Sequence, residues 1–175
     1  MDFRVSREAF LRVLTHVSSI VDSRSTIPIL SNIYLKCENN QIEIRSTDMD
    51  ISIREFVSCD STKNGEATVN SRILTDIIRK TKKNSIVKCK LEGNRLIINS
   101  DNSVFELNAL SADEFPKFVP LDATNSFELT IPQMKRLFNK TKFAISAEET
   151  RYYLNGIYFH TVANGSKTAL RCVAT

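Results

Sequence analysis

Paired carboxylates are the first candidates for catalytic chemistry in this sequence. Asp48 lies two residues before Asp50, and Glu148 directly precedes Glu149. Such pairs can bind Mg²⁺ or transfer protons, as in metal-dependent nucleases and polymerases. These carboxylates lie at polar turns, where such groups are usually solvated. We therefore interpret them as surface residues and keep a metal-dependent nuclease or polymerase domain as an alternative.

Cysteine and histidine do not form a metal-binding pattern. No two cysteines form a CxxC pair, and His16 and His160 lie far from them in the sequence, whereas a zinc site requires closer spacing. With four glycines, the chain also lacks a P-loop or dinucleotide-binding fingerprint. We expect neither a metal nor another cofactor, and reduced structural thiols that fit a cytoplasmic protein. The cysteines are Cys37, Cys59, Cys89 and Cys172.

Positive charge is concentrated in one short segment. The chain has 24 Lys and Arg against 20 Asp and Glu, a net charge of +4. The segment from Arg72 to Lys83 alone carries +4, because its five basic residues are opposed only by Asp76. These basic residues are Arg72, Arg79, Lys80, Lys82 and Lys83. Such a patch suits phosphate contact without base readout, although charge on a surface helix can also serve solubility alone.

Two amphipathic helices must position this charge. Ser6 is a good cap for the first, in which apolar residues recur at helical spacing from Phe10 to Val21. Its polar face carries Arg12, Thr15, His16 and Ser19. The second helix is predicted from Arg72 to Lys83, with one apolar side. The stripe on its other side consists of Arg72, Asp76, Arg79 and Lys83.

Strands with short connections are predicted around both helices. The first helix is preceded by a strand at Phe3–Val5 and followed by strands at Ile29–Cys37, Gln41–Thr47 and Met49–Ser58. A polar link runs from Asp60 to Gly65. The second helix is preceded by a strand at Glu66–Asn70 and followed by strands at Ser85–Leu91, Arg95–Ser100 and Ser103–Leu110. Two strand–helix–three-strand units with helices on one side of antiparallel sheets make an α+β fold.

The first unit begins again after Asn125. Phe3-Arg4-Val5-Ser6 is matched by Phe127-Glu128-Leu129-Thr130, and Leu30 by Leu154, both at an offset of 124 residues. Such a constant register predicts a duplication, with Pro132 in the first turn of a third helix. We expect a complete first domain at residues 1–122 and an incomplete second domain at 123–175, cut short before its third strand. The chain is therefore expected to be a fragment.

Three further residues are candidates for contact with nucleic acid. Arg24 stands in a predicted loop, where it could reach a phosphate or satisfy local carbonyl groups. Tyr152 and Tyr153 are predicted to begin a strand. At least one of these tyrosines could stack or hydrogen-bond at a nucleic-acid surface, while the other could belong to the core.

Several segments together resemble the bacterial DNA polymerase sliding clamp, the β subunit of the replicative polymerase holoenzyme. They are the N-terminal strand–helix opening, RSTIPILSNIYL, STDMDISI, FELNALSADEFP and RYYLNG, and the last residues, ALRCVAT, resemble the run-up to a segment of the type DGHRL. The resemblance spans the whole chain. It implies the DNA-clamp fold, with three similar domains per subunit, sheets outside, and helices lining a hole around duplex DNA; the third domain is absent here.

This resemblance implies a processivity factor that is not an enzyme. A head-to-tail dimeric ring would encircle duplex DNA without sequence specificity and hold the polymerase on its template. The implied partners are duplex DNA, a second clamp subunit, the replicative polymerase and the clamp loader, in the cytoplasm and without a membrane. We do not expect this fragment to form the ring alone. A stand-alone basic DNA-binding domain is the other alternative.

Individual residues also take on implied roles. Positions that face DNA in the family are matched by Arg24, Arg72, Arg79, Tyr152 and Tyr153, and Lys83 continues the same basic stripe. Phe105 and Leu107 match an apolar pair that packs against the third domain of the partner subunit. Leu154 and Thr175 match part of the pocket for clamp-binding peptides, which this chain should bind poorly. Basic residues would be expected at three positions near the interface, occupied here by Ile73, Asn102 and Val104.

Overall fold

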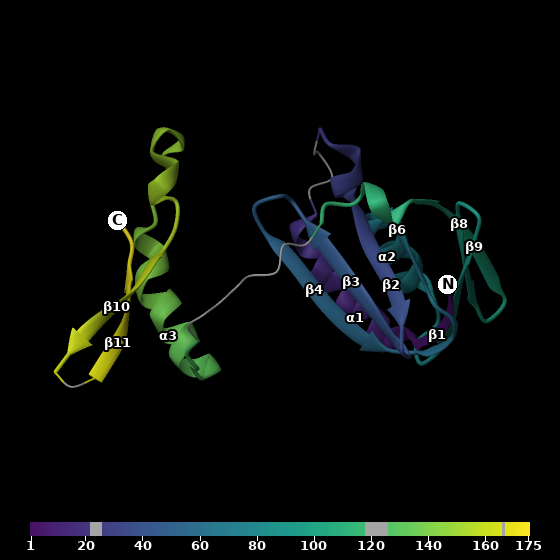
Figure 1. The fold of residues 1–175 in the computed structure, drawn as a ribbon, viewed down its shortest axis with the longest axis horizontal. Helices are drawn as coiled ribbons and strands as arrows, with labels where there is room; N and C mark the ends of the chain where they lie inside the picture. The colour runs from purple at the N-terminus through teal and green to yellow at the C-terminus, as the bar shows by residue number, and fades with distance from the viewer. Residues whose placement is uncertain (22–25, 118–125, 166) are drawn as a thin grey trace. The chain divides into compact units, whose positions relative to one another are not determined.

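The computed structural model describes residues 1–21, 26–117, 126–165 and 167–175 of the chain. They fall into two compact units, Met1–Pro120 and Leu121–Thr175 (Figure 1). The expected domain boundary between residues 122 and 123 lies outside the described residues, as does Arg24.

Unit 1 contains two helices and nine strands among its described residues. The helices are α1 (Arg7–Val17) and α2 (Ser71–Lys80). The strands are β1 (Asp2–Ser6), β2 (Asn32–Glu38), β3 (Gln41–Thr47), β4 (Ser52–Ser58), β5 (Asp60–Lys63), β6 (Gly65–Asn70), β7 (Ile86–Glu92), β8 (Arg95–Ser100) and β9 (Ser103–Leu110). Short 3₁₀ turns, η1 (Ser18–Ile20), η2 (Pro28–Ser31) and η3 (Ala112–Glu114), connect or end these elements.

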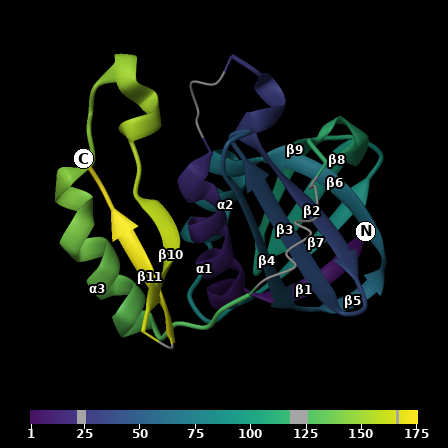
Figure 2. The same cartoon turned by 60° about the vertical axis from the view of Figure 1, so that its left-hand side comes forward.

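The nine strands form one antiparallel sheet in the order β4-β3-β2-β6-β9-β8-β7-β1-β5. The two helices pack against each other, α1 also against β3 and β4, and α2 against β2, β6 and β9 (Figure 2). Apolar side chains from both helices and both halves of the sheet form a single core. Its fully buried members include Phe3, Phe10, Leu14, Ile33, Leu35, Ile44, Leu74, Ile78 and Ile98. The predicted buried faces of both helices therefore organise unit 1.

Several boundaries in unit 1 differ from the expectation. The predicted strand at Ile29–Cys37 begins only at Asn32, because Pro28–Ser31 form the turn η2, and the first helix ends at Val17, before the turn η1. The segment predicted as a polar link contains β5, which pairs with β1. The predicted strand at Met49–Ser58 begins only at Ser52, because Asp48–Ile51 form a turn in which Met49 has a φ of 84°. The predicted second helix ends at Lys80, since Thr81 is extended, so Lys83 lies beyond the helix.

The described residues of unit 2 form one helix followed by a hairpin. Helix α3 (Ile131–Thr141) has Pro132 in its first turn, as predicted, and a capping box between Thr130 and Gln133. The turns η4 (Lys142–Ala144) and η5 (Glu149–Leu154) lead to the paired strands β10 (Tyr158–Asn164) and β11 (Lys167–Val173). The order of α3 and this hairpin repeats that of α1 and the β2–β3 hairpin. The prediction that Tyr152 and Tyr153 begin a strand is wrong, since both lie in η5.

Candidate nucleic-acid interface

The two helices of unit 1 are held together at both of their ends. At one end, Arg7 of α1 donates hydrogen bonds to the carbonyl oxygens of Ile78 (3.2 Å) and Arg79 (2.7 Å) in the last turn of α2. At the other end, Ser18 follows α1, and its hydroxyl oxygen lies 2.7 Å from that of Ser71 and 3.0 Å from that of Thr75. The helices are therefore antiparallel. Because these bonds are partly or fully buried, they fix the register of the pair.

The predicted basic residues lie on the outward side of α2 and beyond its end. Arg72 and Arg79 are exposed, and so is Lys83 in the turn that follows the helix. The guanidinium of Arg79 lies 2.7 Å from a carboxylate oxygen of Asp76, one turn earlier. This pair offsets part of the positive field of the helix. On α1, Arg12 is exposed, whereas His16 pairs through Nδ1 with the carboxylate of Glu55 on β4.

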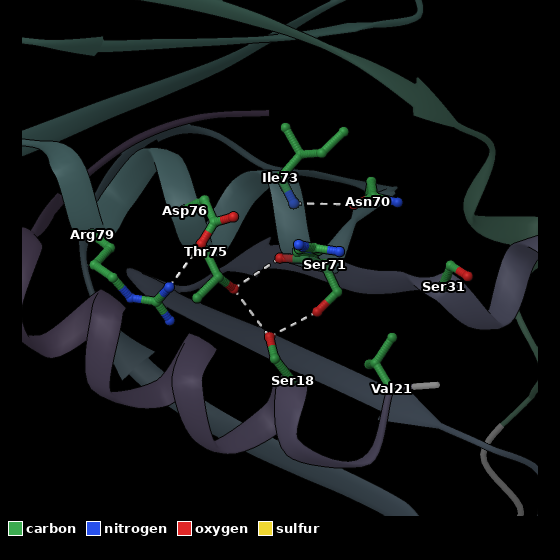
Figure 3. Close-up of a pocket in the computed structure, with 10 residues that line it drawn as sticks. Ser18, Val21, Ser31, Asn70, Ser71, Ile73, Thr75, Asp76 and Arg79 are labelled. Carbon is green, nitrogen blue, oxygen red and sulfur yellow. Dashed lines mark hydrogen bonds and ion pairs between the residues drawn. The ribbon is translucent and has the colours of Figure 1, made fainter. Parts of the chain in front are cut away.

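A surface cavity of about 680 Å³ opens where α1 ends and α2 begins. Figure 3 shows the hydroxyl groups of Ser71 and Thr75 directed toward that of Ser18. Asn70 caps α2 by accepting a hydrogen bond from the Ile73 amide (3.0 Å). The lining residues are Ser18, Val21, Ser31, Asn70, Ser71, Arg72, Ile73, Thr75, Asp76 and Arg79. The cavity thus combines hydroxyl groups with the two arginines predicted to contact DNA.

The tyrosines and the peptide-pocket residues belong to unit 2. Tyr152 and Tyr153 are 78% and 72% exposed, with their rings edge to face at a centroid distance of 6.0 Å. Neither ring packs in a core, so both are available for stacking. Leu154 is partly buried and Thr175 is exposed. Both tyrosine rings are therefore exposed, whereas the sequence analysis allowed one of them to belong to the core.

Phe105 and Leu107, the predicted interface pair, both lie on β9 but differ in how deeply they are buried. Leu107 is 6% exposed and belongs to the core of unit 1, while Phe105 is partly buried against that core. The opposite face of the strand carries exposed Val104 and Glu106. The backbone edge beside these residues is open, because residues 103–108 pair only with β8 within the described chain.

One carboxylate of each acidic pair, that of Asp48 and that of Glu148, makes local contacts. A carboxylate oxygen of Asp48 accepts hydrogen bonds from the amides of Asp50 (3.0 Å) and Ile51 (2.7 Å), which closes the turn before β4. Oε2 of Glu148 lies 3.4 Å from Nε of Arg151. Within the described residues, no group of three or more His, Cys, Asp or Glu side chains could hold a metal ion. The helices in that part of the chain are too short or too polar to cross a membrane.

Sequence reasoning missed Arg7 and Ser18, which join the helices. Arg7 directly follows the predicted cap, and Ser18 follows the last buried residue of α1, so nothing in the local pattern distinguishes either from a solvated residue. Their partners are distant in the sequence: Arg79 lies 72 residues from Arg7, and Ser71 lies 53 residues from Ser18. Only the packing of α1 on α2 could identify these residues.

Comparison with known proteins gives consistent matches along the chain. The family model for the DNA polymerase III beta subunit, N-terminal domain, matches residues 1–119, and the model for the central domain matches residues 128–175. The beta sliding clamp of Caulobacter vibrioides is 40% identical over 177 residues, and that of Pseudomonas aeruginosa is 33% identical over 176. These alignments cover 100% of this chain but 48% and 47% of the relatives. The chain thus spans about half the length of the curated relatives it matches.

Solved structures agree with these relatives. A Caulobacter crescentus pol III beta structure superposes with a TM-score of 0.94 at 39% identity, covering 100% of this chain and 47% of that one. For a DNA polymerase III subunit beta from Pseudomonas aeruginosa the TM-score is 0.92 at 32% identity, with the same coverage. The predicted α+β clamp fold is confirmed by these superpositions.

Proposed function

This chain belongs to the DNA polymerase III beta subunit family, and from that premise we propose that it is part of a sliding clamp. In the proposal, a longer chain forms a ring around duplex DNA and holds the replicative polymerase on its template. Residues 1–122 supply the complete first domain of the ring, and residues 123–175 supply the opening part of the second. The clamp itself catalyses no reaction and works in the cytoplasm.

The observation that carries the proposal is the outward face of the α1–α2 pair. Arg72 and Arg79 project from α2, which Arg7 and Ser18 hold against α1 at both ends. A rigid helix face with few cations suits loose contact with phosphates, which have the same spacing whatever the base sequence. The pairing of Arg79 with Asp76 keeps this attraction weak. Weak contact is what a ring needs, because its topology retains the DNA and tight contacts would hinder sliding.

Other residues extend the proposed contact with DNA. Lys83 adds a cation close to the end of α2, and Arg24 is a further candidate from the family resemblance. Tyr152 and Tyr153 offer exposed rings that could stack on bases or hydrogen-bond to the backbone. We propose these four as supporting contacts, secondary to Arg72 and Arg79.

The remaining partners are proposed by family membership. A second subunit would join head to tail at the β9 edge, with Phe105 supplying apolar contact and Leu107 supporting the strand from within the core. Polymerase and clamp loader would bind a peptide pocket to which Leu154 and Thr175 contribute. Since two residues make only part of a pocket, this chain alone should bind such peptides poorly.

A chimera tests the proposal directly. Residues 1–175 would replace the matching part of the Caulobacter clamp, and the chimera would be loaded onto nicked circular DNA. We expect the ring to remain on circular DNA and to be lost when the DNA is cut to a linear form. Arg72→Ala with Arg79→Ala should weaken the association of the chimera with linear duplex at low salt without unfolding the protein, while the loaded ring stays on circular DNA.

Other outcomes would support the alternative functions. Tight, strongly salt-dependent binding of linear duplex by the 175-residue chain alone would indicate a stand-alone DNA-binding domain. Mg²⁺-dependent cleavage of duplex DNA that disappears in Asp48→Ala would indicate a nuclease. Loss of the chimera from circular and linear DNA at equal rates would contradict the clamp proposal.

A further inference from the structure

Two cysteine side chains meet inside unit 1. Cys37 belongs to β2, and Cys59 lies at the junction between β4 and β5. Their sulfur atoms are 3.9 Å apart, and both thiols are free. Cys37 is completely buried, whereas Cys59 keeps 8% of its surface exposed. The sulfur atoms of a disulfide are about 2.05 Å apart, so these two would have to approach by about 2 Å, a movement that rotation about side-chain bonds can supply.

The backbone around Asn40 holds the two cysteines in this arrangement. Asn39 and Asn40 have φ angles of 52° and 58° and form the tight turn between β2 and β3, two residues after Cys37. The carbonyl oxygen of Asn40 accepts a 2.9 Å hydrogen bond from the amide of Cys59. Its side-chain oxygen accepts two more, from the amide (3.2 Å) and the hydroxyl (2.9 Å) of Ser61. The β4–β5 junction is therefore fastened to the turn that follows Cys37.

The two thiols differ in how an external reagent can reach them. Cys59 is the more exposed of the pair, so a reagent meets it first and Cys37 afterwards attacks from within. Cys89 is the third buried thiol of unit 1 and is completely buried on β7, between β1 and β8. Its strand neighbours are Phe3 and Ile98. Cys89 therefore offers a matched comparison, a thiol as deeply buried as Cys37 but held in the interior of the sheet.

We propose that Cys37 and Cys59 form a reversible disulfide when the protein meets a low-molecular-weight disulfide. This modification goes beyond the proposed clamp function and does not depend on it. The Cys59 thiolate attacks one sulfur of the reagent, whose S–S bond breaks, and the other half leaves as a thiol with the proton that Cys59 released. Cys37 then gives up its proton and attacks the Cys59 sulfur, and the second half leaves as a thiol. The protein loses two electrons and two protons, and the reagent gains them.

The surroundings of the pair make this exchange slow. Burial, followed by Cys37 and the carboxylate of Asp60, raises the pKa of Cys59 to about 12, and the Met1 ammonium is the cation that acts on Cys37. Thiolate is the attacking form, so the rate should rise roughly tenfold for each pH unit in the neutral and mildly alkaline range. A slow exchange keeps both thiols reduced in a reducing compartment and allows the disulfide to accumulate only during sustained oxidation.

The disulfide would brace one half of the sheet. Cys37 and Cys59 are 22 positions apart, and the link encloses β3 and β4. Closing a loop of this length removes conformational entropy from the unfolded chain, which should raise the melting temperature by roughly 5–10 °C. The link also occupies two thiols that would otherwise be open to irreversible oxidation.

Peptide mapping tests the link. The 175-residue chain carrying Cys172→Ser, which removes the thiol of unit 2, would be incubated with glutathione disulfide at mildly alkaline pH and digested without reduction. Mass spectrometry should find the peptides of Cys37 and Cys59 joined, with a mass lower by two hydrogen atoms, and separated again after dithiothreitol. The melting temperature should rise as the link forms and return on reduction.

Three variants assign the roles of the two thiols. Cys37→Ala should stop the reaction at a mixed disulfide between Cys59 and glutathione, because the thiol that resolves it is gone. Cys59→Ala should prevent both the mixed disulfide and the link. Cys89→Ala is the matched control: it removes a completely buried thiol and should leave the link and the rise in melting temperature unchanged. Circular dichroism checks that each variant is folded, and the mapping itself needs no change at Cys37 or Cys59.

Several results would overturn the proposal. One is a folded chain in which both thiols stay free after prolonged incubation, or become linked only in urea, since the folded geometry would then fail to bring the sulfur atoms together. Another is a link between Cys37 and Cys89 in place of Cys59. A Cys37–Cys59 link that lowers the melting temperature would contradict the brace, because strain in the folded state would then outweigh the loss of entropy in the unfolded chain.

Discussion

The guanidinium Nη2 of Arg7 donates a 2.7 Å hydrogen bond to the carbonyl oxygen of Arg79. The last carbonyl groups of a helix lack partners within the helix, and Arg7, the first residue of α1, donates to two of them in α2. Arg7 is only 9% exposed. One residue of the first helix therefore completes the end of the second, whose outward side carries the candidate DNA contacts.

Replacing Arg7 by Met should lower the free energy of unfolding by about 2–3 kcal/mol, because it removes charge-assisted hydrogen bonds to buried carbonyl groups. Urea denaturation followed by circular dichroism measures the loss. Arg12→Met on the exposed side of the same helix makes the same change in charge and should cost less than about 0.5 kcal/mol. Equal losses in both variants would show that Arg7 acts through net charge alone.

Asp76→Asn should strengthen the association of the chimeric clamp with linear duplex, because it frees Arg79 from its 2.7 Å ion pair. The slope of log K against log salt should become steeper by about one phosphate contact. Fluorescence anisotropy over a salt series measures both quantities. Asp113→Asn, which removes a carboxylate from η3, away from the helix face, controls for the change in net charge. If both variants bind alike, the pair with Arg79 does not tune the contact.

Tyr34→Phe should destabilise unit 1 by about 1–2 kcal/mol. The Tyr34 hydroxyl donates a hydrogen bond to the Glu66 carboxylate, and burial, followed by that carboxylate, raises the pKa of Tyr34. Removing the hydroxyl leaves Glu66 without this donor, while the ring contact with Phe115 at 5.8 Å is kept. Tyr158→Phe, at a 67% exposed position, is the control and should have no effect on thermal melting.

Glu8→Gln should remove part of the acid dependence of stability. The Asn84 amide donates a 2.8 Å hydrogen bond to Glu8, which lowers the pKa of this carboxyl from its ordinary value of 4.5. Because the folded pKa is the lower one, the stabilisation is complete above about pH 4.5 and is lost as the pH falls through the folded value. Melting temperatures followed from neutral to acidic pH should therefore converge for the two proteins at the acidic end. A constant difference would argue against ionisation as the cause, and Glu114→Gln provides an exposed control.

Alkylation at mildly alkaline pH should modify only Cys172 rapidly in the folded chain. Cys37 and Cys59 are buried with their sulfur atoms 3.9 Å apart, and burial raises the pKa of Cys59 to about 12 and also raises the pKa of Cys89. A raised pKa leaves little thiolate, which is the reactive form. Mass spectrometry should show one rapidly formed adduct on the native protein and none on native Cys172→Ser. The unsubstituted chain unfolded in urea should gain four adducts, one at each cysteine. Fast addition at Cys59 would mean that the β4–β5 junction opens readily.

Much of the fold follows from local patterns in the chain. The predicted bounds of β3, β8 and β9 agree with the structure, and the apolar spacing from Phe10 to Val17 identifies the buried face of α1. Apolar residues at every second position, or at helical spacing, show which side of an element is apolar. Burial of that side favours a strand in the first case and a helix in the second. The constant offset of 124 residues likewise relates α3 and its hairpin to α1 and the β2–β3 hairpin without any structure.

Features that depend on a partner distant in the sequence could not be predicted from local patterns. The polar segment Asp60–Lys63 is a strand because β1 pairs with it, and Lys83 lies outside α2 because the chain leaves the helix at Thr81. Leu107 turns inward to the core, and the tyrosines lie in a 3₁₀ turn rather than a strand. Each of these outcomes is set by non-local pairing or packing, which local propensity does not encode.

Residue types and their periodicity alone determined the α+β class, the duplicated unit and the basic segment on the second helix, and specific segments such as RSTIPILSNIYL carried the family resemblance. Tertiary structure alone decided that Arg7 and Ser18 join the helices, that Asp76 pairs with Arg79, and which strand edges are open. The reason is physical. Periodicity is a property of neighbours along the chain, whereas ion pairs, helix-end hydrogen bonds and free edges depend on which side chains and segments meet when the elements pack together.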